Sequence, residues 1–157
     1  MNIVITGASK GIGKAIAEAY AATGHTLFLC SRNEEQLNKT AKELMGKYPG
    51  VKIKIKARDL SVKEEAQGFG KWILENNYPI DILINNAGQF IPGSINNEEE
   101  GILEKMIAVN LYSAYHLTRV LVPDMIKRKT GHIFNICSIA ALKAYDNGGS
   151  YSISKYA

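Results

Sequence analysis

The 157-residue sequence contains only two cysteines, Cys30 and Cys137, and each follows a short run of apolar residues. So few cysteines cannot form a disulfide framework, and we expect two buried free thiols of the kind found in a reducing cytoplasm. The three histidines, His25, His116 and His132, have no metal-ligand spacing with one another or with the cysteines. The sequence therefore predicts no metal site.

Long apolar runs are absent too: no stretch approaches the roughly 20 residues that a membrane-spanning helix needs. The first residues form a β-branched run without a basic segment before it, which is not typical of a signal peptide. Low-complexity tracts, internal repeats and long linkers are also missing. We therefore expect one cytoplasmic domain over residues 1–157 with no membrane partner.

Charge of one sign is not concentrated anywhere, although the net charge is +4. Lys52, Lys54 and Lys56 alternate with apolar residues, and this pattern predicts one solvated face of a strand. It does not resemble the basic stripe of a nucleic-acid-binding protein, so no nucleic-acid partner is predicted. The modest excess of positive charge favours anionic ligands.

The chain is organised around its opening, where a β-branched run leads into Gly7, Gly11 and Gly13 and then into a helical pattern. A helix that begins at such a turn presents free N–H groups and a positive dipole end, which suits a phosphate. A P-loop would need Ser or Thr after Gly13-Lys14, but Ala15 follows, which argues against a nucleotide triphosphatase. A tight connection that binds nothing is the alternative interpretation of the turn taken alone.

Strand and helix patterns alternate along the whole chain. A Ser61-x-x-Glu64 capping box predicts the start of the third helix, and Pro123 is expected to kink or divide the long helix at 98–129. Such alternation predicts an α/β fold with a doubly wound, Rossmann-type parallel sheet of order 3-2-1-4-5, whose ligand crevice lies at the carboxyl ends of the strands. The expected strands lie near residues 3–6, 26–30, 51–57, 80–84 and 132–137, and the last helix begins near 151.

The polar motifs fall at the predicted strand ends or on the predicted helices, in one order along the chain. They are Thr6-Gly-x-x-x-Gly-x-Gly13, Asn85-Asn-Ala-Gly88, Asn110, Ser138 and Tyr151-x-x-x-Lys155. With these motifs the sequence resembles the short-chain dehydrogenase/reductase family over its whole length. The resemblance implies an NAD(P)-dependent oxidoreductase.

The resemblance assigns catalytic roles to Asn110, Ser138, Tyr151 and Lys155. A phenol with a pKa of about 10 is a poor proton carrier at neutral pH, and a lysine one helical turn away stabilises the phenolate. Ser138 can donate a hydrogen bond to a substrate carbonyl, while the resemblance implies that Lys155 also binds the nicotinamide ribose and that Asn110 holds a water. Each residue also has a plainer interpretation: a surface Tyr–Lys pair, a capping serine, or an asparagine at a helix bend.

Cofactor preference depends on the residues that follow the second strand. Ser31 and Arg32 occupy the place where NAD-preferring enzymes carry a carboxylate, and Lys10 lies in the glycine turn. Two cations without a carboxylate favour the 2′-phosphate of NADPH, although Arg32 as a solvated loop residue is the alternative. The predicted cofactor-binding residues are Gly7, Ser9, Lys10, Gly11, Ile12, Gly13, Ser31, Arg32, Asp59, Leu60, Asn86, Ala87, Gly88, Tyr151 and Lys155.

These patterns favour an NADPH-dependent enzyme that reduces a ketone or 3-oxoacyl carbonyl, with Tyr151 as the proton donor. An alcohol dehydrogenase working in the oxidative direction and a catalytically silent nucleotide-binding or scaffold protein are the alternatives. Family members continue beyond the point that matches Ala157, so we expect a C-terminally incomplete domain that is inactive by itself. The resemblance also implies a homodimer or homotetramer for the complete protein.

Overall fold

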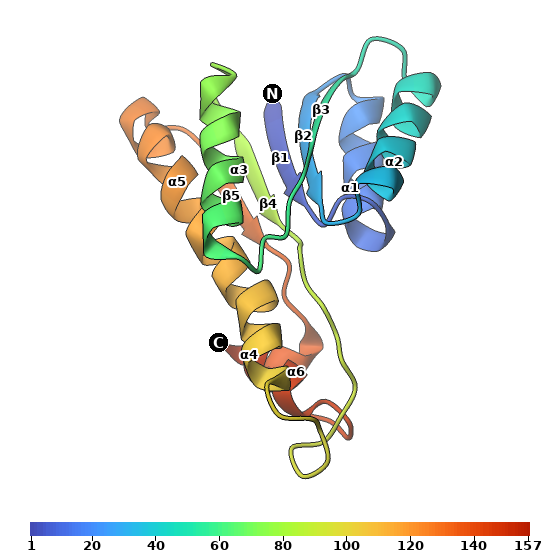
Figure 1. Cartoon of the computed structure of the whole chain (residues 1–157). Coiled ribbons are helices and arrows are strands. Elements are labelled where there is room, and N and C mark those ends of the chain that lie inside the picture. Colours follow the sequence, from blue (N-terminus) through green and yellow to red (C-terminus); the bar gives the residue numbers. More distant parts are fainter.

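A five-stranded parallel sheet forms the centre of the structure, a computed structural model that describes residues 1–157 (Figure 1). The strand order is β3-β2-β1-β4-β5, so the predicted doubly wound α/β arrangement is confirmed. All neighbouring strands pair in parallel. The strands are β1 (Asn2–Thr6), β2 (Thr26–Ser31), β3 (Lys52–Ala57), β4 (Ile82–Asn85) and β5 (His132–Asn135).

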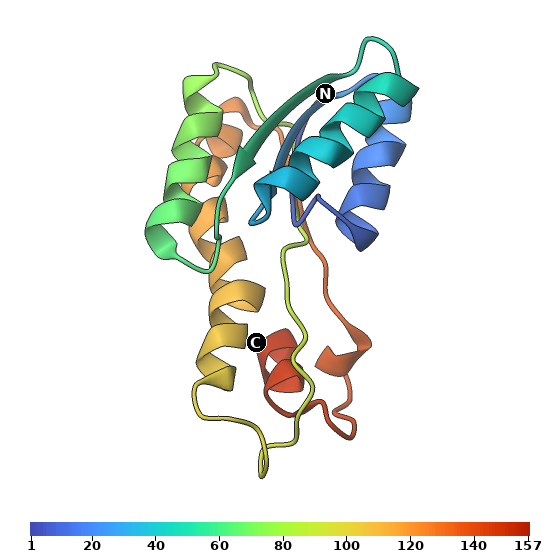
Figure 2. The ribbon, with the colours of Figure 1, turned by 45° about the vertical axis from the view of Figure 1, so that its right-hand side comes forward.

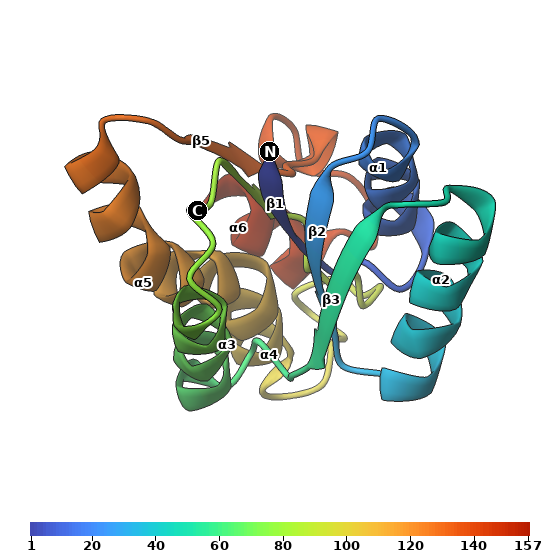
Figure 3. The ribbon, with the colours of Figure 1, turned by 90° about the horizontal axis from the view of Figure 1, so that it is seen from above.

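Helices cover both faces of this sheet, as the view from above shows (Figure 3). One face carries α1 (Gly11–Ala22) and α2 (Glu34–Lys47), and the other carries α3 (Lys63–Glu75) and α5 (Ser113–Arg128). Two short helices, α4 (Ile102–Ile107) and α6 (Gly149–Tyr156), lie beyond the carboxyl ends of the strands (Figure 2). The molecule therefore has a sheet body and an extension below its carboxyl edge.

The core consists of two apolar clusters, one on each face of the sheet. Side chains of β1 alternate between them: Ile3 and Ile5 pack in the cluster that includes residues of α1 and α2, and Val4 packs in the cluster that includes residues of α3 and α5. All three are fully buried. A strand covered on both faces must be apolar at every position, which explains the continuous run in the sequence.

The region predicted as one helix over 98–129 has three parts. The chain turns at Gly101, whose φ is +83°, and α4 begins only at Ile102. A π-helical segment, Ala108–Tyr112, then joins α4 to α5. Pro123 lies inside α5 and does not divide it. Packing explains this tolerance: α5 buries Leu117, Leu121 and Met125 on either side of the proline, and this burial outweighs one missing hydrogen bond.

The predicted capping box at the third helix is wrong. Helix α3 begins at Lys63 after Val62, and no side chain caps it. The Ser61 amide and hydroxyl instead donate to the Asp59 carboxylate, at 3.0 and 2.7 Å. The carboxylate of Asp59 lies two residues away and competes successfully for the serine that would otherwise cap the helix.

Two predictions of side-chain environment are only half right. Cys30 is buried, but Cys137 is exposed, because it follows the edge strand β5, all of whose residues are exposed. Burial raises the pKa of the Cys30 thiol to about 12. Among the alternating lysines of β3, Lys52 is exposed, whereas Lys54 is half-buried with its ammonium 4.7 Å from the centre of the Tyr78 ring. A cation over an aromatic face is stabilised there, so this face of β3 is not simply solvated.

None of the helices combines the length and the apolar composition that crossing a membrane requires. The structure also contains no group of three or more His, Cys, Asp and Glu side chains arranged to bind a metal ion.

Candidate active site

The glycine turn between β1 and α1 is closely packed on one side and open on the other. Gly7 and Gly11 have φ angles of +64° and +55°, which side chains rarely adopt. A Cβ atom on Gly13 would lie 2.3 Å from the Gly7 carbonyl oxygen, so only glycine lets α1 approach the turn. Lys10 precedes α1 without a side-chain cap, which leaves the first-turn N–H groups available to a phosphate.

Thr6 joins this turn to the loop that follows β4. Its hydroxyl oxygen accepts hydrogen bonds from the backbone N–H groups of Asn86 at 2.9 Å and Ala87 at 2.8 Å. The Asn86 side-chain amide donates in return to the carbonyl oxygen of Thr6 at 2.9 Å. Sequence reasoning placed Thr6 in the motif but gave it no role. The bonds show that it aligns two loops that lie far apart in the sequence.

A cavity of about 310 Å³ lies at the carboxyl ends of β1, β2 and β3. Most residues predicted to bind a cofactor line it, but Gly13 does not, because that residue is buried under the turn. Arg58 and Val109 line it as well and were not predicted. The lining residues from the prediction are Gly7, Ser9, Lys10, Gly11, Ile12, Ser31, Arg32, Asp59, Leu60, Asn86, Ala87 and Gly88.

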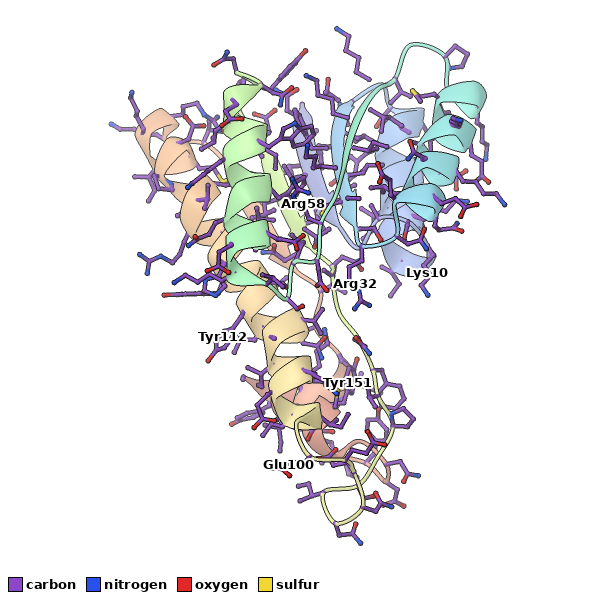
Figure 4. The ribbon with its side chains drawn as sticks, viewed as in Figure 1. Lys10, Arg32, Arg58, Glu100, Tyr112 and Tyr151 are labelled. Atoms are coloured by element: carbon purple, nitrogen blue, oxygen red, sulfur yellow. The ribbon has the colours of Figure 1, made fainter.

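Three cations from three different loops border this cavity: Lys10, Arg32 and Arg58 (Figure 4). The one carboxylate in its lining belongs to Asp59, which already accepts two hydrogen bonds from Ser61. The cavity is therefore positively charged, and the cationic loops fit the phosphates of a dinucleotide. Arg58 could have been found from the sequence, since it is a cation at the end of the third predicted strand.

A second cavity, of about 190 Å³, contains Tyr151 and Lys155 in its lining. It shares three lining residues with the first cavity: Ile12, Asn86 and Gly88. The two cavities therefore adjoin along the loop after β4. The predicted Tyr–Lys pair lies beside the predicted cofactor turn although about 140 residues separate them in the chain.

Two contacts determine the position of Lys155. Its ammonium donates to the Ile136 carbonyl oxygen at 3.2 Å. A Cβ atom on Gly88 would lie 3.5 Å from the Lys155 nitrogen and 3.2 Å from the Asn110 side-chain oxygen. Gly88 thus lies beside both side chains: a larger residue there would be tight against the Asn110 oxygen and in ordinary contact with the Lys155 nitrogen.

Asn110 connects the loop after β4 to α6. Its side-chain oxygen accepts from the Gln89 N–H at 2.7 Å, and its amide donates to the Gln89 carbonyl at 3.0 Å and to the Ser154 hydroxyl at 2.8 Å. Asn110 lies in the π-helical segment, where the wider turn changes the direction of side chains. Its side-chain amide bonds to the loop after β4 and to α6 rather than to its own helix.

Ser138 lies in the loop after β5, one residue beyond Cys137, which lines the second cavity. Its hydroxyl oxygen accepts from the Ala140 N–H at 3.2 Å and caps a 3₁₀ turn, Ile139–Ala141. It lines neither the first nor the second cavity. The Ser138 hydroxyl can still donate its proton to another group, because the bond to Ala140 uses only a lone pair of the oxygen.

The aromatic ring of Tyr151 packs against the edge of a neighbour. The centres of the Phe90 and Tyr151 rings are 4.9 Å apart in a T-shaped arrangement. Phe90 is about half exposed and lines the same cavity. The cavity therefore combines an apolar wall with a phenol and an ammonium group, which is suited to a small, mostly apolar molecule that presents one oxygen.

A family model described as short chain dehydrogenase matches residues 1–157. The sequence is 31% identical over 154 residues to an uncharacterized oxidoreductase of Staphylococcus epidermidis, and the alignment covers 98% of this chain. The chain spans 65% of the length of that relative.

Two solved structures are closely similar. One is an alcohol dehydrogenase from the archaeon Thermococcus sibiricus complexed with 5-hydroxy-NADP, with a TM-score of 0.92 and 33% identity, covering 99% of this chain and 65% of that one. The other is a metagenomic short-chain oxidoreductase in complex with NADP, with a TM-score of 0.92 and 34% identity. The match covers 99% of this chain and 70% of that one.

Proposed function

The chain belongs to the short-chain dehydrogenase/reductase family, and we propose that it is an NADPH-dependent oxidoreductase that reduces a ketone or 3-oxoacyl carbonyl to a secondary alcohol. The observation that carries the proposal is the wall shared by the two cavities, made of Ile12, Asn86 and Gly88. A nucleotide-binding turn and a candidate proton donor therefore border one another. Hydride transfer to a carbonyl needs both in one place.

NADPH supplies the hydride when bound, and the chain's own residues bind and orient it. We assign the phosphates to the N-terminus of α1 and to Lys10, Arg32 and Arg58, the cations around the first cavity. The preference for NADPH over NADH rests on these cations and on the engagement of Asp59 with Ser61. The two structural relatives with NADP-type ligands support the assignment.

Tyr151 donates the proton to the carbonyl oxygen in this proposal. The Lys155 ammonium stabilises the phenolate that forms, and the Ile136 carbonyl orients that ammonium. Ser138 donates its free hydroxyl proton to the same substrate oxygen, and Asn110 uses the second lone pair of its side-chain oxygen to bind a water that returns protons.

The test is consumption of NADPH by the purified complete protein with a panel of ketones and 3-oxoacyl thioesters. We expect turnover by the wild type and by Tyr145→Phe, which alters another half-exposed tyrosine before α6, but not by Tyr151→Phe. Equal turnover in wild type and Tyr151→Phe would show that another group donates the proton. Absence of turnover with every carbonyl in the panel would contradict the proposed reaction.

A second candidate is the oxidation of a secondary alcohol with NADP as acceptor. The similarity to the Thermococcus sibiricus alcohol dehydrogenase favours it, and the same residues serve, with the Tyr151 phenolate accepting the proton. Measuring kcat/KM in both directions at one pH, with a matched ketone and alcohol, distinguishes the two candidates.

We further propose that the complete protein is a homodimer or homotetramer in the cytoplasm. Large exposed side chains on the π-helical segment and on α5 support the assembly: Tyr112 and Tyr115 are about half exposed, and Ile126 is 68% exposed. Figure 4 shows Tyr112 pointing away from the rest of the molecule. The two free thiols are compatible with a reducing compartment. Light scattering on the purified protein measures the assembly.

A further inference from the structure

We propose that Glu98, in the loop between β4 and α4, is a positioning residue for Tyr151 and Lys155. Its carboxylate caps the first turn of α6, the helix that carries both residues. The proposal rests on the function proposed above for those two side chains. It assigns to Glu98 no contact with substrate or cofactor.

The contact joins residues 52 positions apart in the sequence. The hydroxyl of Ser150 donates to one oxygen of the Glu98 carboxylate, and the backbone N–H of Ser150 donates to the other at 3.3 Å. Ser150 is only 1% exposed, so water cannot readily replace these bonds. Gly148, the residue at the N-cap position of α6, has no side chain to cap the helix. The cap comes from the distant loop instead.

Backbone contacts bring the loop and the helix together independently of the carboxylate. The Gly93 N–H donates to the Asn147 carbonyl at 3.1 Å, and the Gly149 N–H donates to the Gly93 carbonyl at 3.0 Å. A Cβ atom on Gly149 would lie 3.0 Å from the Gly93 oxygen. Removing the carboxylate alone should therefore loosen the helix start without displacing the loop.

A second contact fixes α6 one turn later, where Ser154 accepts from the Asn110 amide at 2.8 Å. Ser150 and Ser154 are four residues apart, so they lie on one face of the helix, and Tyr151 and Lys155 follow each of them by one residue. Fixing the serine face at two points sets the rotation of α6 about its axis. That rotation decides the direction in which Tyr151 and Lys155 point.

Electrostatics favours the same arrangement. A carboxylate at a helix N-terminus interacts with the positive end of the helix dipole and with N–H groups that lack a helical partner. An uncapped first turn frays, and Tyr151 is the third residue of this short helix. A displacement of about 1 Å of a catalytic group can cost on the order of a hundredfold in rate.

The test compares Glu98→Ala, Glu98→Gln and Ser150→Ala with the control Glu100→Gln, which alters an exposed carboxylate of the same loop (Figure 4). In Glu98→Ala we expect kcat to fall about tenfold to a hundredfold while the Kd for NADPH stays within about twofold. Glu98→Gln retains one acceptor for Ser150 and should lose less. Glu100→Gln should match the wild type in every measurement.

Hydrogen exchange provides a readout that does not depend on turnover. The amides of the first turn of α6 should exchange at least about tenfold faster in Glu98→Ala than in wild type, whereas the amides of β1 should not change. Faster exchange together with lower kcat supports the proposal. Unchanged exchange, or faster exchange with unchanged kcat, overturns it.

The two proposals can fail separately. If the wild type turns over no carbonyl, the proposed function fails, and exchange in α6 alone then decides whether Glu98 caps the helix. If the wild type is active but Glu98→Ala also loses NADPH affinity to the same extent as kcat, the effect is a general loss of structure, and the positioning role is rejected. Glu98→Gln guards against a variant that does not fold.

Discussion

The two halves of the candidate site are built in different ways. The nucleotide half lies at the ends of β1, β2 and β3, whose apolar residues are fully or partly buried in the two core clusters. The half that carries the proposed proton donor lies in the extension below the sheet, on α6 and the segments beside it (Figure 2). There, Tyr151 and Lys155 depend on a few polar contacts made by Glu98, Asn110 and Lys155 itself.

The fold alone therefore positions the first half, while individual side chains position the second. A residue at the end of a buried strand is fixed by the register of the whole sheet. A residue on an eight-residue helix is fixed only by the packing and bonding of that helix, because so short a helix is marginal by itself. Substitutions should therefore separate catalysis from cofactor binding.

The largest effect is expected from Tyr151→Phe. Loss of the hydroxyl removes the proposed proton donor, and general acid catalysis contributes about a hundredfold to ten-thousandfold in rate. The ring still packs against Phe90, so the affinity for NADPH should stay within about twofold. Steady-state kinetics and fluorescence titration of NADPH check the two expectations. If Tyr151→Phe loses both catalysis and NADPH binding, the two halves of the site do not act separately.

A glycine pair tests the rigidity of the nucleotide half. The added methyl group of Gly13→Ala would meet the Gly7 oxygen at 2.3 Å, and we expect it to lower the free energy of unfolding by about 1–3 kcal/mol and to weaken NADPH binding. Gly46→Ala is the matched control, because nothing lies within 4 Å of the added atom and Gly46 lies in α2. That change should raise stability by up to about 1 kcal/mol.

Chemical denaturation measures both glycine variants under the same conditions. If Gly13→Ala is as stable as Gly46→Ala and binds NADPH normally, the turn is more adaptable than the close contact implies.

A more moderate effect is expected from Arg32→Asp. The change removes a cation from the first cavity and adds a carboxylate after β2, which favours a ribose hydroxyl over a phosphate. We expect the ratio of NADPH to NADH affinity to fall about tenfold or more, with kcat for the better cofactor little changed. Titration of both cofactors provides the measurement, and equal wild-type affinities would refute the proposed preference.

The smallest effect is expected from chemical labelling of the two thiols in the wild-type protein. Burial raises the pKa of Cys30 to about 12, so at pH 8 it is almost entirely protonated and unreactive, whereas Cys137 is exposed. Iodoacetamide should therefore label Cys137 alone in the native protein and both cysteines after denaturation. Mass spectrometry identifies the sites, with Cys137→Ser as the control. Native labelling of Cys30 would show that the body of the sheet opens readily.

Much of the nucleotide half could be predicted from the sequence because local patterns determine it. The β-branched run of β1 and the spacing of Gly7, Gly11 and Gly13 predict a strand, a turn and a helix without reference to distant residues. The alternation of strands and helices then limits the sheet to few orders, and the observed order is the predicted one. Arg58 was missed although its position after β3 could have revealed it.

The family, the sheet order and the polar residues at the strand ends could all be predicted from the sequence. Tertiary structure alone decided how α6 is capped by Glu98, that Asn110 bonds Gln89 and Ser154, that Ser61 turns to Asp59, and that Cys137 is exposed. These outcomes depend on which groups from distant segments compete for the same donors and acceptors. The residue pattern within one segment predicts whether that segment is a helix or a strand, but it does not show which distant groups will compete for its donors and acceptors.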